Sequence, residues 1–133
     1  MARPKTPHPT PGELEVLRVL WRDGACTVRE VMDQLNLNRK RPRVYTSVMS
    51  LLNVMADKDL LRREPQGRAF VYRPRVKESP TLRRIAADLL ERVFDGSASQ
   101  LVAHALDQTS VDTAELDAIT DMIEAHRRKK ENS

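Results

Sequence analysis

The sequence predicts a mainly α-helical protein, in which three short helices and a β-hairpin come first and three further helices follow. Apolar residues recur with the 3.6-residue period of a helix along most of the chain, and the period changes to two only between residues 60 and 73. The charge also changes: residues 1–75 carry 15 Lys and Arg against 8 Asp and Glu, whereas residues 76–133 carry 8 against 11. We therefore expect two domains, of which only the first, basic one meets a polyanion.

The composition argues against several classes of protein. No run of about 18 apolar residues is present and the N-terminal segment has no apolar signal core, so we expect a soluble, cytoplasmic protein. Cys26 is the single cysteine and is expected to be a small buried hydrophobe, so we expect no disulfide. His8, His104 and His126 lie far apart, and neither a Gly-rich phosphate loop nor a metal-ligand spacing occurs. We therefore expect no enzyme, cofactor or metal, and we place His104 on a helix at or near an interface.

The first helix has a complete start signal. Residues 1–9 are rich in proline and are expected to form a disordered, mildly basic arm. Thr10 then acts as N-cap, Pro11 takes the first helical position and Glu13 completes a capping box, and the helix ends at Gly24. The residues expected on its buried side are Leu14, Leu17, Leu20 and Trp21.

The second helix is short and is also capped. Thr27 is its N-cap and Glu30 completes the capping box, after one short extended piece at Cys26 and Thr27. Its apolar stripe consists of Val28, Val31, Met32 and Leu35. The polar segment 36–42 interrupts the periodicity before the next helix begins.

The third helix lies within residues 39–59 and is amphipathic. One stripe is apolar: Val44, Val48, Leu51, Leu52 and Met55. The opposite side carries mostly short hydrogen-bonding groups: Arg43, Thr46, Ser50, Asn53 and Asp57. Cations cluster around Pro42 at its start: Arg39, Lys40, Arg41 and Arg43. Such a face suits a helix that enters the major groove of DNA, and an ordinary hydrated surface helix is the alternative.

A basic β-hairpin follows. The runs 60–64 and 69–73 are separated by four residues that include Gly67, which supplies a positive φ. Four arginines decorate this hairpin: Arg62, Arg63, Arg68 and Arg73. Three helices followed by a basic hairpin form a winged helix-turn-helix over residues 10–75, whose wing lies along the sugar-phosphate backbone.

Residues 76–79 are expected to be a linker, and residues 80–133 a helical domain. Ser79 and Pro80 open one helix that Gly96 ends, Ser97 caps a second, and Asp112 opens a third. Three helices of this length cannot close a core alone, so we expect a second copy to cover them. The residues expected at this dimer interface are Leu89, Leu101, Leu116, Ile119 and Ile123.

Five segments carry a resemblance to a known family: TPGELEVLRVLW, TVREVMDQL, YTSVMSLLNVMADKDLL, QGRAFVYRP and the C-terminal LVAHALDQTSVDTAELDAITDMIE. With them, the chain from Thr10 to about His126 resembles the penicillinase repressor family of bacterial transcription factors. The resemblance implies an N-terminal winged helix with a C-terminal helical dimerisation domain. It also implies a homodimeric repressor of resistance or stress genes, bound to an inverted-repeat operator in double-stranded DNA.

The chain departs from the family's pattern in two ways. The copper-responsive branch has paired cysteines near its C-terminus, whereas this chain ends in HRRKKENS, which excludes direct copper sensing by that route. In the β-lactam-responsive branch a membrane-anchored metalloprotease sensor leads to cleavage at an Asn-Phe bond. The matching positions here are His104 and Ala105. They mark the candidate cleavage region, with direct metal or small-molecule induction as the rival.

The DNA-binding residues expected from this reading fall into two groups. Arg43, Thr46, Ser47 and Ser50 are expected at the major groove, and Arg62, Arg63 and Arg68 on phosphates. Arg39, Lys40 and Arg41 are also expected to bind DNA. Arg43 is expected to bind guanine, with a phosphate contact as the alternative, and Thr46 to place its methyl group against a thymine methyl. Two alternatives stay open: a winged helix that docks on a protein, and a small-molecule-responsive regulator of another winged-helix family.

Overall fold

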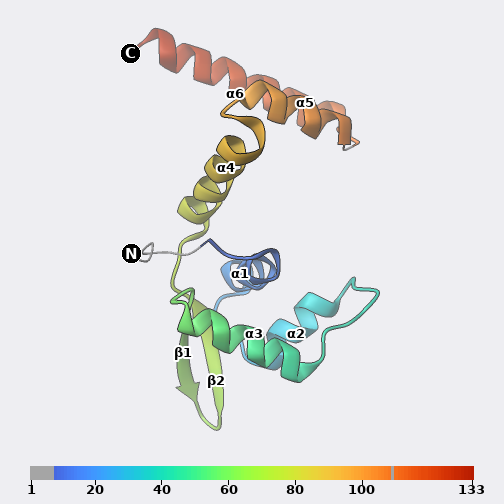
Figure 1. The fold of residues 1–133 in the computed structure, drawn as a ribbon, viewed down its shortest axis with the longest axis vertical. Coiled ribbons are helices and arrows are strands. Elements are labelled where there is room, and N and C mark those ends of the chain that lie inside the picture. Colours follow the sequence, from blue (N-terminus) through green and yellow to red (C-terminus); the bar gives the residue numbers. More distant parts are fainter. Residues whose placement is uncertain (1–7, 109) are drawn as a thin grey trace. The chain divides into compact units, whose positions relative to one another are not determined.

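The computed structural model describes residues 8–108 and 110–133, and the chain divides by packing into two units (Figure 1). The first unit ends at Ala86 and the second begins at Ala87. Most of the expected arm, residues 1–7, lies outside the described residues. The predicted fold class is confirmed, because six helices and one two-stranded antiparallel hairpin occur in the predicted order within the described residues.

The first unit contains α1 (Pro11–Asp23), α2 (Val28–Asn36) and α3 (Tyr45–Asp57). Both predicted capping boxes are present. The Thr10 hydroxyl accepts a hydrogen bond from the Glu13 N–H at 3.2 Å, and the equivalent bond in α2 is also 3.2 Å long. Each box fixes the residue at which its helix begins, so the apolar stripes of α1 and α2 face the same core.

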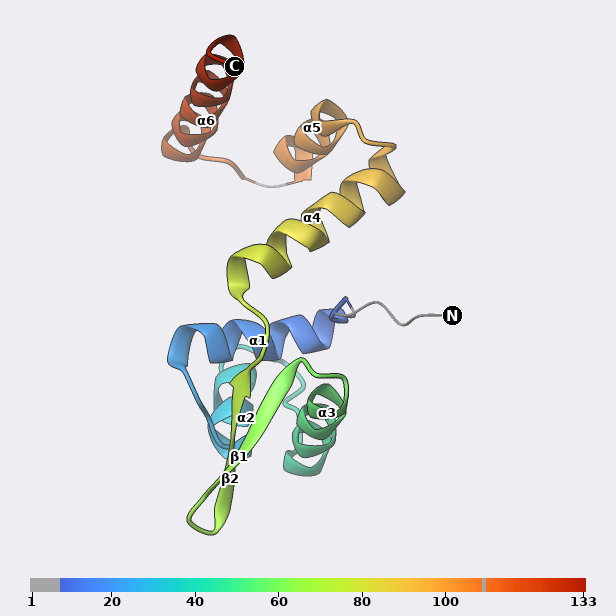
Figure 2. The same ribbon diagram turned by 90° about the vertical axis from the view of Figure 1, so that its left-hand side faces the viewer.

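The hairpin consists of β1 (Leu61–Gln66) and β2 (Ala69–Pro74), and it lies beside α3 (Figure 2). Gln66 pairs with Ala69, so the turn contains only two residues and the expected four-residue loop is wrong. Gly67 has a φ of +62° at the first turn position, which permits a tight turn and lets pairing continue to Gln66. Tyr72 also forms an isolated antiparallel β-bridge with Cys26, which lies in the short segment that was predicted to be extended.

The core of the first unit is apolar and is built from all three helices and the hairpin. Its fully or nearly fully buried members are Val16, Leu17, Leu20, Cys26, Val28, Val31, Val48, Leu52, Met55, Leu60, Leu61 and Tyr72. Val44 was expected in this core and is 64% exposed. It is the N-cap of α3, so its extended backbone does not follow the helical spacing that placed it there. Cys26 is buried as expected, and burial raises the pKa of its thiol.

A buried carboxylate joins α1 to the end of α3. Glu13 is 2% exposed, and the Lys58 ammonium lies 2.9 Å from its Oε2 atom. Burial opposes ionisation of this carboxyl group, but the Thr10 N–H and the Lys58 charge outweigh burial, so the pKa of Glu13 is lowered. Glu13 thus completes the capping box of α1 and also holds the end of α3 against α1.

The expected linker is attached to the first unit. The indole N–H of Trp21 donates a hydrogen bond of 2.9 Å to the Val76 carbonyl, and Val76 packs against the core. Helix α4 (Glu78–Phe94) then begins at Glu78, before the predicted opening at Ser79 and Pro80. The first unit therefore includes the first turns of α4.

The second unit contains the rest of α4 together with α5 (Ala98–Gln108) and α6 (Thr113–Glu131). Ser97 and Asp112 cap α5 and α6 as predicted. No described residue of this unit is buried, and its apolar side chains are half-buried or exposed. The ring of His104 lies 5.6 Å from that of Phe94.

Candidate nucleic-acid interface

Helix α3 presents its short polar side chains outward. Thr46, Ser47 and Ser50 are all exposed, while Val48 on the same helix is buried in the core. Tyr45 and Met49 are also exposed, at 43% and 38%. Tyr45 and Met49 form an i, i+4 row that adjoins the row of Thr46 and Ser50. The exposed face of α3 is therefore part polar and part apolar.

Hydrogen bonds link this helix to the hairpin. The side-chain oxygen Oδ1 of Asn53 on α3 accepts hydrogen bonds from the Tyr72 hydroxyl at 2.9 Å and from the Arg63 guanidinium at 3.2 Å. The same guanidinium lies over the Phe70 ring, 4.8 Å from its centroid. Arg63 is thus held from two sides, and β1 and β2 are both tied to α3.

The α3–wing groove is a concavity of about 580 Å³ between α3, the start of α2 and the hairpin. Its lining residues are Thr27, Val28, Arg29, Tyr45, Met49, Asn53, Arg63, Arg68, Ala69, Phe70 and Tyr72. Three of these are arginines and none is Asp or Glu. On α2, the Arg29 guanidinium lies 5.8 Å from the centroid of the Tyr45 ring. The groove therefore combines an apolar floor with positive charge.

Sequence reasoning missed four members of this groove: Arg29, Tyr45, Met49 and Phe70. Arg29 lies on α2, for which only the apolar stripe was used to predict a role. Phe70 and Tyr72 are two residues apart on β2 and so lie on the same face of the hairpin, yet Phe70 is 48% exposed and Tyr72 is 2% exposed. The bridge between Tyr72 and Cys26 accounts for the difference, because it places only Tyr72 against the core.

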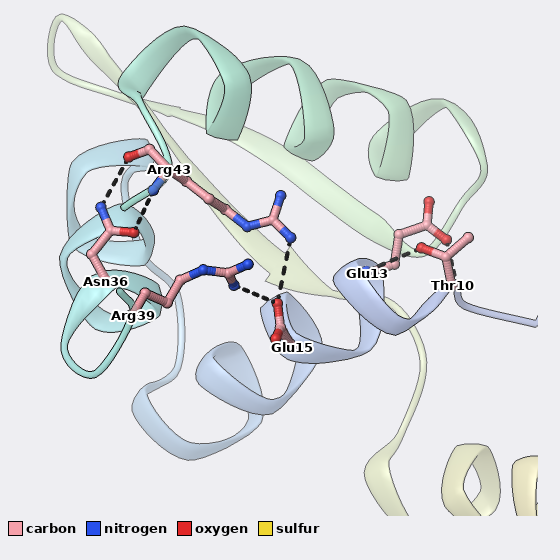
Figure 3. A network of polar contacts seen from close by, with 6 residues as sticks. All are labelled: Thr10, Glu13, Glu15, Asn36, Arg39 and Arg43. Carbon is pink, nitrogen blue, oxygen red and sulfur yellow. Dashed lines mark hydrogen bonds and ion pairs between the residues drawn. The ribbon is translucent and has the colours of Figure 1, made fainter. Parts of the chain in front are cut away.

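The two arginines that flank the α2–α3 loop turn toward α1 (Figure 3). Glu15 Oε2 lies 3.1 Å from Arg39 Nη1 and 3.5 Å from Arg43 Nη2. A Cβ atom on Gly12 would lie 3.2 Å from Arg43 Nη2, so the guanidinium packs closely against the first turn of α1. The expected position of Arg43 on the outer face of α3 is wrong, because Arg43 precedes the N-cap and is not part of the helix.

Asn36 closes the α2–α3 loop. Its side-chain oxygen accepts from the Arg43 N–H at 2.8 Å, and its side-chain nitrogen donates to the Arg43 carbonyl at 2.9 Å. Lys40 and Arg41 are exposed on the closed loop. Lys40 and Arg41 thus form no ion pair with Glu15, whereas the exposed Arg39 and the half-buried Arg43 both pair with it.

The arginines of the wing differ in their surroundings. Glu64 lies between two of them, 3.1 Å from Arg73 and 3.8 Å from Arg62. Arg68 lies in the turn and is exposed. The positive charge that faces the groove therefore comes from Arg63 and Arg68, with Arg29 opposite.

The profile of the penicillinase repressor family matches residues 9–125. The chain belongs to the penicillinase repressor family. The predicted resemblance is therefore confirmed, and the family is one of transcriptional repressors.

The chain is also similar to two curated proteins and to one solved structure. The chain is 25% identical over 127 residues to the penicillinase repressor of Bacillus licheniformis, an alignment that covers 95% of this chain and 97% of that one. It is 27% identical over 107 residues to an uncharacterized 16.5 kDa protein in the ptsI 3′ region of Latilactobacillus sakei, covering 80% and 72%. The solution structure of Bacillus licheniformis BlaI, as a monomer with the blaP half-operator, is 29% identical. That comparison covers 55% of this chain and 87% of the other, with a TM-score of 0.47.

The described residues contain neither a candidate membrane span nor a candidate metal site. Within residues 8–108 and 110–133, none of the helices combines the length and hydropathy that a bilayer crossing needs. In the same part of the chain, no group of three His, Cys, Asp or Glu side chains is placed to hold a metal ion.

Proposed function

We propose that this family member is a homodimeric repressor that binds an inverted-repeat operator in double-stranded DNA. The α3–wing groove carries the proposal, because three arginines and no carboxylate line it and the exposed hydroxyls of α3 adjoin it. In this arrangement α3 enters the major groove and the wing follows the backbone. We also place the protein in the cytoplasm, where it has access to the chromosome.

The side chains divide the task of recognition. Thr46, Ser47 and Ser50 face base edges, because they are exposed, short and able to donate and accept hydrogen bonds. Phosphates are contacted by exposed cations of the wing and of the α2–α3 loop: Arg62, Arg63, Arg68, Lys40 and Arg41. Arg39 and Arg43 act from behind, because their pairing with Glu15 holds the loop that leads into α3.

The dimer is proposed to form through the second unit. Its described residues form no buried core, and several large apolar side chains are more than one third exposed. These are Leu89, Val93, Val102, Leu106, Leu116, Met122 and Ile123. The half-buried Leu101 and Ile119 lie on the same helices. A second copy of the same surface buries them most simply, and two joined winged helices match the two half-sites of an inverted repeat.

We further propose that the repressor controls resistance or stress genes and that cleavage in α5 ends repression. The candidate region is His104 and Ala105, and the agent is a membrane-anchored metalloprotease sensor. Both residues lie inside α5, so the helix must first open locally before a protease can bind an extended chain. Cutting there removes the bivalent advantage that joins the two half-sites.

A gel shift tests the central proposal. The full chain should shift a DNA fragment from the promoter region of its own gene, and an excess of unrelated DNA should not displace it from this fragment. Equal competition by unrelated DNA would contradict operator recognition.

The proposed cleavage is tested in cells treated with a cell-wall antibiotic, by blotting for the protein while operator occupancy is measured. Loss of operator occupancy while the full-length chain stays intact would contradict cleavage as the mechanism. Occupancy lost on adding a metal or a small molecule to purified protein would favour the rival form of induction.

A further inference from the structure

The floor of the α3–wing groove exposes apolar groups that a purely polar DNA contact does not use. Tyr45, Met49 and Phe70 are between 38% and 48% exposed, although they belong to two elements that pack together. Exposed apolar side chains gathered in one concavity commonly mark a contact surface. A partner of this groove must match an apolar floor and a cationic rim together.

Charge decides between the partners. Arg29, Arg63 and Arg68 line the groove, and the lining contains no Asp or Glu. An apolar protein segment would leave three guanidinium groups to be desolvated without counter-ions, which is costly. A single DNA strand offers phosphates at regular spacing and, between them, deoxyribose rings whose C–H faces are apolar. The strand therefore matches the rim and the floor together.

We infer that the α3–wing groove holds one sugar-phosphate strand of the operator, with Arg29, Arg63 and Arg68 on phosphates and Met49 and Phe70 against deoxyribose. This inference rests on the proposed function and deepens it. It adds Arg29 of α2 as a phosphate contact and assigns the apolar floor to the sugars.

Asn53 is the positioning residue of this site. Its side-chain oxygen Oδ1 accepts hydrogen bonds from both the Tyr72 hydroxyl and the Arg63 guanidinium, so the side chain fixes Arg63 relative to α3. The Phe70 ring supports the other face of the same guanidinium. Arg63 thus needs little rearrangement on binding, which lowers the entropic cost of the phosphate contact.

Binding of the full-length variants to the operator and to a random duplex, measured at several salt concentrations, tests the inference. Arg29→Ala should reduce the salt slope by about 0.9 and weaken binding to both duplexes about fivefold at 0.15 M salt, which is the factor that this slope gives. Met49→Ala should weaken both without changing the slope, because it removes an uncharged contact. Arg18→Ala is the matched control, since Arg18 is exposed on α1 and does not line the groove.

A double-mutant cycle tests the role of Asn53. Asn53→Ala should reduce the salt slope as Arg63→Ala does, and the double variant should bind no more weakly than Arg63→Ala alone. Additive losses would contradict the positioning role. If the wild-type chain binds the operator and the groove variants bind as well as Arg18→Ala does, the inference fails while the proposed function stands. If the wild-type chain shows no preference for the operator, the proposed function itself fails.

Discussion

The side chain of Asn36 bridges the backbone of Arg43 on both sides, accepting from its N–H at 2.8 Å and donating to its carbonyl at 2.9 Å. The bridge joins the last residue of α2 to the segment before α3. It places the start of the proposed recognition helix without using a side chain that faces DNA.

Asn36→Ala should therefore destabilise the protein by about 1–3 kcal/mol, because the N–H and the carbonyl of the half-buried Arg43 both lose their partner. Urea unfolding followed by circular dichroism measures this change. Asn38→Ala is the matched control, because Asn38 is an exposed asparagine of the same loop. Equal unfolding midpoints for the two variants would contradict a structural role of the bridge.

The pair of Glu13 and Lys58 predicts a dependence of stability on pH. Glu13 has a lowered pKa in the folded state against an ordinary value of 4.5. Its ionisation therefore stabilises the fold above pH 4.5, and this contribution is lost as the pH falls through the lowered value. Lys58→Met should remove part of this contribution and cost about 1–3 kcal/mol at pH 7. Lys40→Met, which changes an exposed lysine, should leave the pH profile of unfolding unchanged.

Arg68 and Thr46 should differ in the kind of binding they support. Arg68→Ala should weaken binding to operator and random DNA about equally and reduce the salt slope by about 1, because it removes a phosphate contact. Thr46→Ala should instead change the ranking of operator variants. In particular, replacing the contacted thymine by uracil, which lacks the methyl group, should weaken the wild-type complex and leave the Thr46→Ala complex unchanged. The same loss on both DNAs for both variants would overturn this division.

The proposed dimer predicts a clear effect of truncating its apolar side chains. Leu116→Ala should weaken dimerisation by about 2–5 kcal/mol if this leucine becomes fully buried in the dimer. Sedimentation equilibrium measures the change, and Leu37→Ala is the control because Leu37 is an exposed leucine of the first unit. A chain that ends at Ala86 should sediment as a monomer. A dimer of that chain would place the interface in the first unit.

The sequence was sufficient to predict the local features of the fold. Thr10 and Thr27 were identified as caps because a capping box is complete within four residues. The order of the helices and the hairpin followed from the spacing of apolar residues, because this spacing repeats several times within each element. Val44 shows the limit of that reasoning, because a helical spacing applies only after the first helical residue, and Val44 precedes it.

The candidate site was harder to predict because its contacts are distant in sequence. Arg43 is paired with Glu15, 28 residues earlier, and packs closely against Gly12 of the same helix. The groove brings together Arg29, Met49 and Phe70 from three elements, and no local pattern relates them. The hydroxyls of α3 were predicted because they share a single helix face.

The hydrogen bond between Trp21 and the Val76 carbonyl has an optical consequence. Trp21 is the only tryptophan of the chain, so all indole fluorescence comes from the point where the segment after the wing rests on α1. Releasing Val76 would transfer the indole N–H to water and shift the emission to longer wavelength. The unlabelled protein therefore carries its own spectroscopic reporter of whether the start of α4 stays attached when DNA binds or when α5 is cut.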